Sequence, residues 1–85
     1  MQKYSYYKEK ETAIRNPGDN LDFISYNGEL WDELPNEPDY SKLLDEEQLI
    51  EAMHEKNVNR LNVYTYLVED LENSEIECLG YEIMI

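Results

Sequence analysis

Acidic side chains outnumber basic ones by 20 to 7 in this chain, and the resulting formal charge of −13 constrains its fold more than any other feature. The excess is uneven: residues 1–15 hold four basic side chains against Glu9 and Glu11, so the rest of the chain carries −15. No basic side chain follows Arg60. Such a one-sided surface destabilises its own compact state by self-repulsion. We therefore expect an external requirement to maintain the charge, and the simplest is a strongly cationic partner.

Size and residue types predict one folded domain spanning residues 1–85. Hydrophobic residues make up 41% of the chain and aromatic residues 12%, whereas disordered acidic tails lack the apolar residues that offset the entropy of ordering. Cys78 is the single cysteine, so no intrachain disulfide can form, which fits a reducing cytoplasm. We expect neither a secretory signal nor a membrane span, because the first eight residues contain no apolar h-region and no apolar run approaches ~20 residues.

Anionic partners are the ones that this composition argues against most strongly. Membranes rich in anionic lipid and the phosphates of DNA or RNA would both repel a chain of this charge. We therefore expect no direct binding to nucleic acid or to membranes. The sequence does not decide between a monomer and a homodimer.

The clearest β signal is a hairpin predicted around Asn27-Gly28, a dipeptide favoured in two-residue type I′ turns. It would join residues 21–26 to residues 29–34 and place Asp22 opposite Glu33. Trp31 between two glutamates suits an interface anchor, and the alternative is a core tryptophan with the hairpin faces reversed. In the predicted register one face holds Leu21, Phe23, Leu30 and Leu34, and the other shows Ile24, Tyr26 and Trp31 among Asp22, Glu29 and Glu33.

A helix is predicted over residues 46–56. Asp45 can serve as its N-cap, with Gln48 three residues later in a capping-box arrangement, and Asn57 can serve as its C-cap. An apolar stripe through this segment predicts one buried face.

Three further segments are predicted as strands. Residues 61–69 carry apolar side chains on both faces, as in a central strand, and residues 2–9 and 75–85 flank it in the sequence. The order β, β-hairpin, α, β, β predicts an α+β domain, a small antiparallel sheet of four to five strands with one α-helix packed on it.

The predicted helix carries Glu47, Glu51 and Glu55 at successive i,i+4 positions, with no basic side chain at that spacing. Like-charged pairs at this spacing cost roughly 0.2–0.5 kcal/mol each. An ordinary solvated helix face accounts for the row as readily as a surface kept for contact with basic side chains of a partner.

A second group of carboxylates lies in the C-terminal part of the chain, with no basic residue among them. Carboxylates two residues apart on a strand stand about 6.6 Å apart, and those four residues apart on a helix about 5–6 Å. These spacings are of the same order as those between neighbouring phosphates of a nucleic-acid strand. The group comprises Glu69, Asp70, Glu72, Glu75, Glu77 and Glu82.

No catalytic, metal or cofactor site can be assembled from the sequence. His54 and Cys78 are too few for a structural zinc site, and nothing resembles a nucleophile elbow or a Ser/His/Asp set. Calcium loops starting at Asp19 or Asp39 fail in register. Three glycines are too few for a phosphate-cradling loop. We expect a protein without enzymatic activity, metal or cofactor.

Size, charge and α+β pattern together resemble a functional class: small acidic inhibitors from phages and mobile elements that imitate nucleic acid. The class includes inhibitors of uracil-DNA glycosylase, anti-restriction proteins and anti-CRISPR proteins. No diagnostic motif carries the resemblance, so it transfers no site residues. It implies a cytoplasmic inhibitor that blocks the nucleic-acid-binding site of a bacterial defence or DNA-processing enzyme, which is the cationic partner expected from the charge.

Two alternatives remain open. An immunity protein or antitoxin would use the same acidic surface to neutralise a cationic nuclease toxin. A small adaptor in a phage or host assembly would use the face of Tyr64 and Tyr66, with the charge serving solubility. The residues predicted to bind the partner are Glu47, Glu51, Glu55, Asp22, Glu29, Trp31, Glu33, Glu69, Asp70, Glu72, Glu75 and Glu77.

Overall fold

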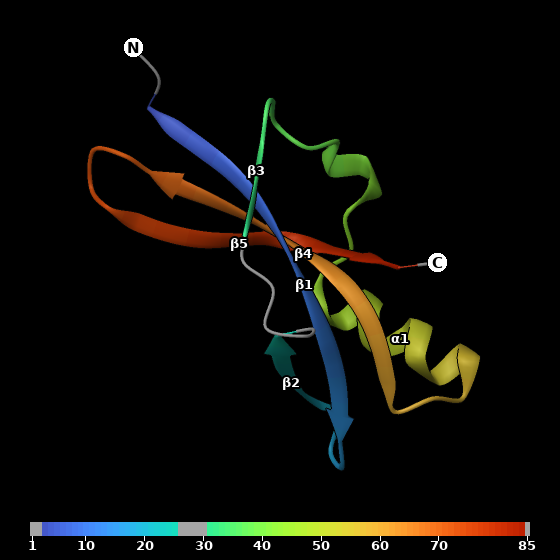
Figure 1. Ribbon diagram of the computed structural model, residues 1–85. Helices are drawn as coiled ribbons and strands as arrows, with labels where there is room; N and C mark the ends of the chain where they lie inside the picture. Colours follow the sequence, from blue (N-terminus) through green and yellow to red (C-terminus); the bar gives the residue numbers. More distant parts are fainter. Residues whose placement is uncertain (1–2, 26–30, 85) are drawn as a thin grey trace.

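The computed structural model describes residues 3–25 and 31–84 and shows an antiparallel five-stranded sheet with one α-helix, so the predicted α+β class is confirmed. The strand order is β2-β1-β4-β5, and β3 pairs with the same edge of β1 as β2 does (Figure 1). The elements are β1 (Tyr4–Asn16), β2 (Asn20–Ser25), β3 (Asp32–Leu34), a 3₁₀ turn (Tyr40–Lys42), α1 (Glu46–Lys56), β4 (Arg60–Asp70) and β5 (Glu75–Ile83).

α1 begins and ends where its capping residues predict. The Asp45 carboxylate accepts a 2.8 Å hydrogen bond from the backbone N–H of Gln48, and the Gln48 side chain accepts one of 3.0 Å from the backbone N–H of Asp45. These two bonds complete the predicted capping box. Asn57 adopts the left-handed conformation, with φ of 57°, and closes the helix as its C-cap.

The predicted Asn27-Gly28 hairpin is not confirmed. Its turn lies outside the described residues, and the described parts of β2 and β3 pair with β1 rather than with each other. This pairing places Asp22 opposite Ile14 and Glu33 opposite Tyr7. The predicted opposition of Asp22 and Glu33 is therefore wrong.

The physical reason is the length of β1. The strand runs Tyr4–Asn16, whereas the sequence predicted a strand only over residues 2–9, and its outer edge is long enough for both β2 and β3. The turn at residues 17–19 closes β1 onto β2, with Gly18 and Asp19 at positive φ of 88° and 59°. Glycine and aspartate tolerate this conformation better than most residues.

Different parts of the chain cover the two faces of the sheet. α1 packs on one face, here called the helix face, and residues 35–43 cross the other, here called the strap face (Figure 1). Side chains alternate along a strand, so odd-numbered residues of β1 and β4 lie on the helix face and even-numbered ones on the strap face. The buried core lies under α1 and consists of Ala13, Leu49, Met53, Val63 and Tyr81.

The strap returns to the sheet at the outer edge of β5, where Gly80 makes room for it. The backbone N–H of Leu44 donates to the carbonyl of Tyr81 at 2.7 Å, and the N–H of Tyr81 donates to the carbonyl of Leu44 at 2.9 Å. A Cβ at Gly80 would lie 2.9 Å from the Cβ of Leu43, and the φ of Gly80 is 152°. Only glycine fits this crossing without strain.

α1 covers only one end of the helix face. The β4–β5 hairpin extends away from the helix, and the molecule measures 45 × 27 × 24 Å (Figure 1). Every residue from Leu71 to Cys78 is exposed. The hairpin from Leu71 to Cys78 is therefore accessible to a partner.

Candidate functional site

The helix row of Glu47, Glu51 and Glu55 lies on the solvent side of α1. All three side chains are exposed, while Leu49 and Met53 face the sheet and are fully buried. Within the described part of the chain, none of the three glutamates forms an ion pair. The structure therefore presents the row as three uncompensated charges along a rigid element.

A second acidic surface lies on the helix face beyond the end of α1. Here the indole of Trp31, which is 41% exposed, lies beside the ring of Tyr7, with centroids 5.7 Å apart. Register and alternation place four glutamates on the same face as the two rings. We call this surface the acid–aromatic strip, and it comprises Tyr7, Glu9, Glu11, Trp31, Glu33 and Glu69.

Uncharged donors hold the carboxylates of the strip. Glu9 accepts 2.7 Å and 3.0 Å hydrogen bonds from the Trp31 indole N–H and the Ser25 hydroxyl. Glu69 accepts a 3.2 Å bond from the Tyr7 hydroxyl, and Glu11 accepts one from the Thr65 hydroxyl. These donors orient the carboxylates without adding positive charge, so the strip keeps its negative potential.

Glu9 and Glu11 are absent from the residues predicted to bind a partner, because they lie in the one segment of positive local charge. The structure shows that this charge is sorted by strand alternation. Lys8 and Lys10 lie on the strap face, whereas Glu9 and Glu11 lie on the helix face. The alternating run Lys-Glu-Lys-Glu within a strand is the signal that would have identified them.

The C-terminal carboxylates divide between the two faces. Glu69 belongs to the strip, whereas Asp70, Glu75 and Glu77 lie together on the strap face at the free end of the hairpin. Asp70 and Glu75 are directly opposite each other across β4 and β5, and with Tyr4 and Val68 the three carboxylates line a hollow of about 150 Å³.

Asp70 also shapes the turn that follows it. Its carboxylate accepts hydrogen bonds from the side-chain amide of Asn73 at 2.9 Å and from the backbone N–H groups of Glu72 and Asn73. These bonds, the Asn73 side-chain bond above all, lower the pKa of Asp70. Glu72 is exposed in the turn beside it.

The residues predicted to share the hairpin face are separated. Trp31 and Glu33 lie on the helix face, but Asp22 lies on the strap face, where its carboxylate accepts a 2.6 Å bond from the Asn16 amide. Glu29 lies outside the described residues. The prediction that Asp22, Trp31 and Glu33 form one surface is therefore wrong, because β2 and β3 pair with β1 independently.

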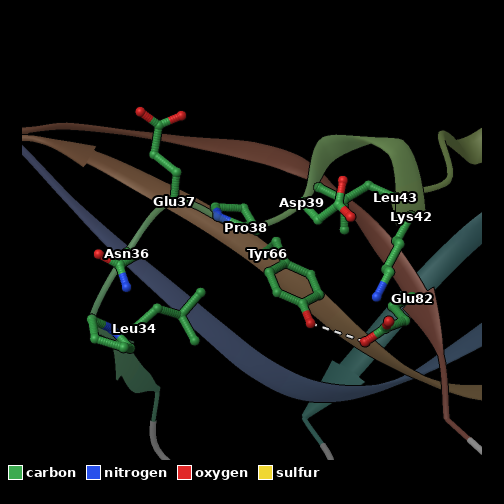
Figure 2. A pocket seen from close by; sticks show the side chains of 10 residues that line it. Leu34, Asn36, Glu37, Pro38, Asp39, Lys42, Leu43, Tyr66 and Glu82 are labelled. Atoms are coloured by element: carbon green, nitrogen blue, oxygen red, sulfur yellow. Dashed lines mark hydrogen bonds between the residues drawn. The ribbon is translucent and has the colours of Figure 1, made fainter.

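The strap face has mixed charge. Lys8 lies over the ring of Tyr64, 4.6 Å from its centroid. Residues 35–43 enclose a cavity of about 340 Å³ above Tyr66, whose hydroxyl donates a 2.9 Å bond to Glu82, and the side chain of Lys42 points toward Glu82 (Figure 2). Burial and the Glu82 carboxylate raise the pKa of Tyr66 to about 12.

The single histidine and the single cysteine of the sequence lie on different elements. His54 on α1 lies 3.1 Å from the Asp19 carboxylate of the β1–β2 turn, and Cys78 is exposed on β5. Across residues 3–25 and 31–84, no group of three or more histidines, cysteines and acidic residues could hold a metal ion.

Comparison with known proteins gives no relative: no family model, curated protein or solved structure matches the chain. No helix in the described ranges has the length and apolar character needed to span a bilayer.

Proposed function

We propose that this chain is a non-enzymatic protein inhibitor whose acidic surface takes the place of DNA or RNA in the nucleic-acid-binding site of a bacterial defence or DNA-processing enzyme. The observation that carries the proposal is the sorting of charge across β1. Glu9 and Glu11 join Trp31 on the helix face, and Lys8 and Lys10 are directed to the other face. A run of four residues with no net charge, Lys8 to Glu11, thereby contributes to a negative surface.

Rigid elements support this role, because mimicry needs fixed spacing between charges. Glu9 and Glu11 are two residues apart on β1, a separation of about 6.6 Å along the strand. Glu47, Glu51 and Glu55 repeat at each turn of α1, about 5–6 Å apart. Both rows belong to hydrogen-bonded secondary structure, so little entropy is lost on fixing them in a complex.

Trp31 supplies the short-range part of recognition. Tryptophan is enriched among residues that dominate binding energy, and an exposed indole ringed by carboxylates can pack against a partner's apolar surface while the carboxylates meet basic side chains. Long-range attraction between the negative surface and a cationic enzyme accelerates encounter and makes association sensitive to salt. The enzyme targeted would be encountered in the cytoplasm.

Affinity capture from a bacterial lysate at low salt, followed by elution with rising salt, tests the proposal. We expect recovery of a nucleic-acid-binding enzyme that competing DNA or RNA displaces and whose activity the chain inhibits. Recovery of a protein that nucleic acid does not displace contradicts the proposal. Recovery of a secreted nuclease toxin supports the immunity protein in its place.

Charge reversal tests which surface acts. The variant E47K/E51K/E55K should slow association with the captured enzyme at low salt and leave dissociation nearly unchanged. The matched control D22K/D32K/E37K changes net charge by the same amount on exposed residues of β2, β3 and the strap. Equal effects of the two variants would show that only total charge matters, and an unchanged association rate for the helix variant excludes the helix row.

A further inference from the structure

The outer edge of β5 is open along the free end of the hairpin. β5 is the last strand of the sheet, and residues 75–78 are all exposed. In the described part of the chain, the backbone partner recorded on this edge is Leu44, which pairs with Tyr81 beyond a register shift in β5. Among the strands that the structure describes, none therefore pairs with the outer edge from Glu75 to Cys78.

The bridge to Leu44 shows which backbone groups point outward. Both the N–H and the carbonyl of Tyr81, a helix-face residue, bond to Leu44 rather than to β4. The backbone groups of alternate strand residues point to opposite sides. The register after the shift pairs Leu67 with Cys78 and Glu69 with Ile76, so the outward groups in this stretch belong to Ile76 and Cys78.

Side chains along this edge have a clear pattern. Ile76, which is 48% exposed, and Cys78 lie on the helix face, whereas Glu75 and Glu77 lie on the strap face beside Asp70. A complementary strand therefore alternates apolar side chains on one face with basic side chains on the other. A second copy of this chain does not fit, because antiparallel pairing of two β5 edges brings like charges together.

We propose that residues 75–78 of β5 accept an extended segment of the partner as a further strand, in which basic side chains alternate with apolar ones. This inference rests on the proposed cationic partner and adds the mode of contact. Main-chain hydrogen bonds to Ile76 and Cys78 would supply affinity, and Glu75 and Glu77 would select the basic residues. Leu44 occupies the next position along the edge and ends the added strand.

A set of three peptides tests strand addition. The first is a synthetic peptide of alternating lysine and valine. The second carries N-methyl groups on its valines, whose N–H groups would face β5, and the third carries them on its lysines, whose N–H groups would face solvent. All three have the same charge, and the two methylated peptides have the same number of methyl groups.

We expect the unmodified and lysine-methylated peptides to bind and to slow amide exchange at Ile76 and Cys78. Exchange at Glu75 and Glu77, whose N–H groups point to β4, should stay unchanged. Methylated valines should weaken binding about tenfold or more, since each removes a backbone hydrogen bond. The substitution pair E75Q/E77Q should weaken binding of the unmodified peptide, whereas D32N/E37Q, which removes the same charge from exposed residues of β3 and the strap, should not.

Equal binding by the two methylated peptides overturns strand addition, and so does absence of binding by all three. Neither result bears on the inhibitor function, which affinity capture and nucleic-acid competition test separately. Pairing of β5 between two copies of the chain, detected as a dimer that the peptide dissociates, would overturn the assignment of a basic partner to this edge.

Discussion

The rings of Phe23 and Tyr81 stack with their centroids 4.8 Å apart and their planes 5° from parallel, although β1 and β4 lie between the strands that carry them. Ala13, fully buried on β1 opposite Phe23, has a side chain small enough to leave room for both rings. The stack thus links the two outer parts of the sheet over the core.

Loss of this stack should destabilise the fold more than any surface change. Tyr81→Ala should lower the free energy of unfolding by roughly 3–5 kcal/mol, the range for a large buried aromatic side chain. Tyr81→Phe keeps the ring and should stay within about 1 kcal/mol of the parent. Urea unfolding followed by circular dichroism measures both, and equal losses in the two variants would contradict a role for the stacked ring.

Stability should fall in alkaline solution through Tyr66. Its pKa is about 12 in the folded protein and 10.0 for an ordinary tyrosine, so the folded state keeps a proton that the unfolded state loses. Tyr66 therefore makes its full contribution to the free energy of unfolding below pH 10, and this contribution decreases as pH rises toward 12. Urea unfolding across this range should show a smaller decrease for Tyr66→Phe. An identical slope in parent and variant would contradict the assignment.

Gly80→Ala should destabilise the crossing of the strap over β5. The added Cβ would meet the Cβ of Leu43 at 2.9 Å and the carbonyl of Leu44 at 3.1 Å, at a φ that disfavours side chains. We expect a loss of roughly 1–3 kcal/mol. Thermal unfolding measures it, and Leu79→Ala at the neighbouring position serves as a control for a general effect of changes in β5. A stable Gly80→Ala protein would show that the strap can shift.

Single exchange of Glu51 for lysine should separate stability from binding. The change replaces two repulsive i,i+4 pairs with attractive ones, so the free energy of unfolding should rise by several tenths of a kcal/mol. Association with the captured enzyme should become slower at low salt, and the difference should shrink as salt rises. A variant that gains stability and keeps its association rate would show that Glu51 serves solvation alone.

Local signals predicted the parts of the fold that local interactions determine. The start of the helix is set by Asp45 and Gln48 and its end by Asn57, and these capping interactions join residues that are close in the sequence. The apolar content of residues 61–69 predicted the central strand. Strand pairing is not local. The turn at residues 17–19 closes β1 onto β2, and pairing along the 13-residue β1 packs Leu21 and Phe23 against the core under α1. The Asn27-Gly28 signal alone does not predict that pairing.

The candidate site was predictable in part for the same reason. The helix row needs only the 3.6-residue period, and the structure presents it as expected on the exposed side of α1. The acid–aromatic strip is built from residues of β1, β3 and β4. Predicting it would therefore require knowledge of the strand register that places Glu33 beside Tyr7 and Glu69 near the same ring. Glu9 and Glu11 do not stand out in the summed charge of residues 1–15, because the charges of Lys8 and Lys10 on the opposite face cancel theirs.

The run Lys8-Glu9-Lys10-Glu11 cancels in any sum over the sequence, yet in the sheet it separates opposite signs across the thickness of one strand. These four residues therefore form a local dipole across β1, negative on the side of Trp31 and positive on the side of Tyr64. A basic side chain that comes close to β1 is attracted by Glu9 and Glu11 on one face and repelled by Lys8 and Lys10 on the other, so a run whose charges add to zero still distinguishes the two faces of the sheet.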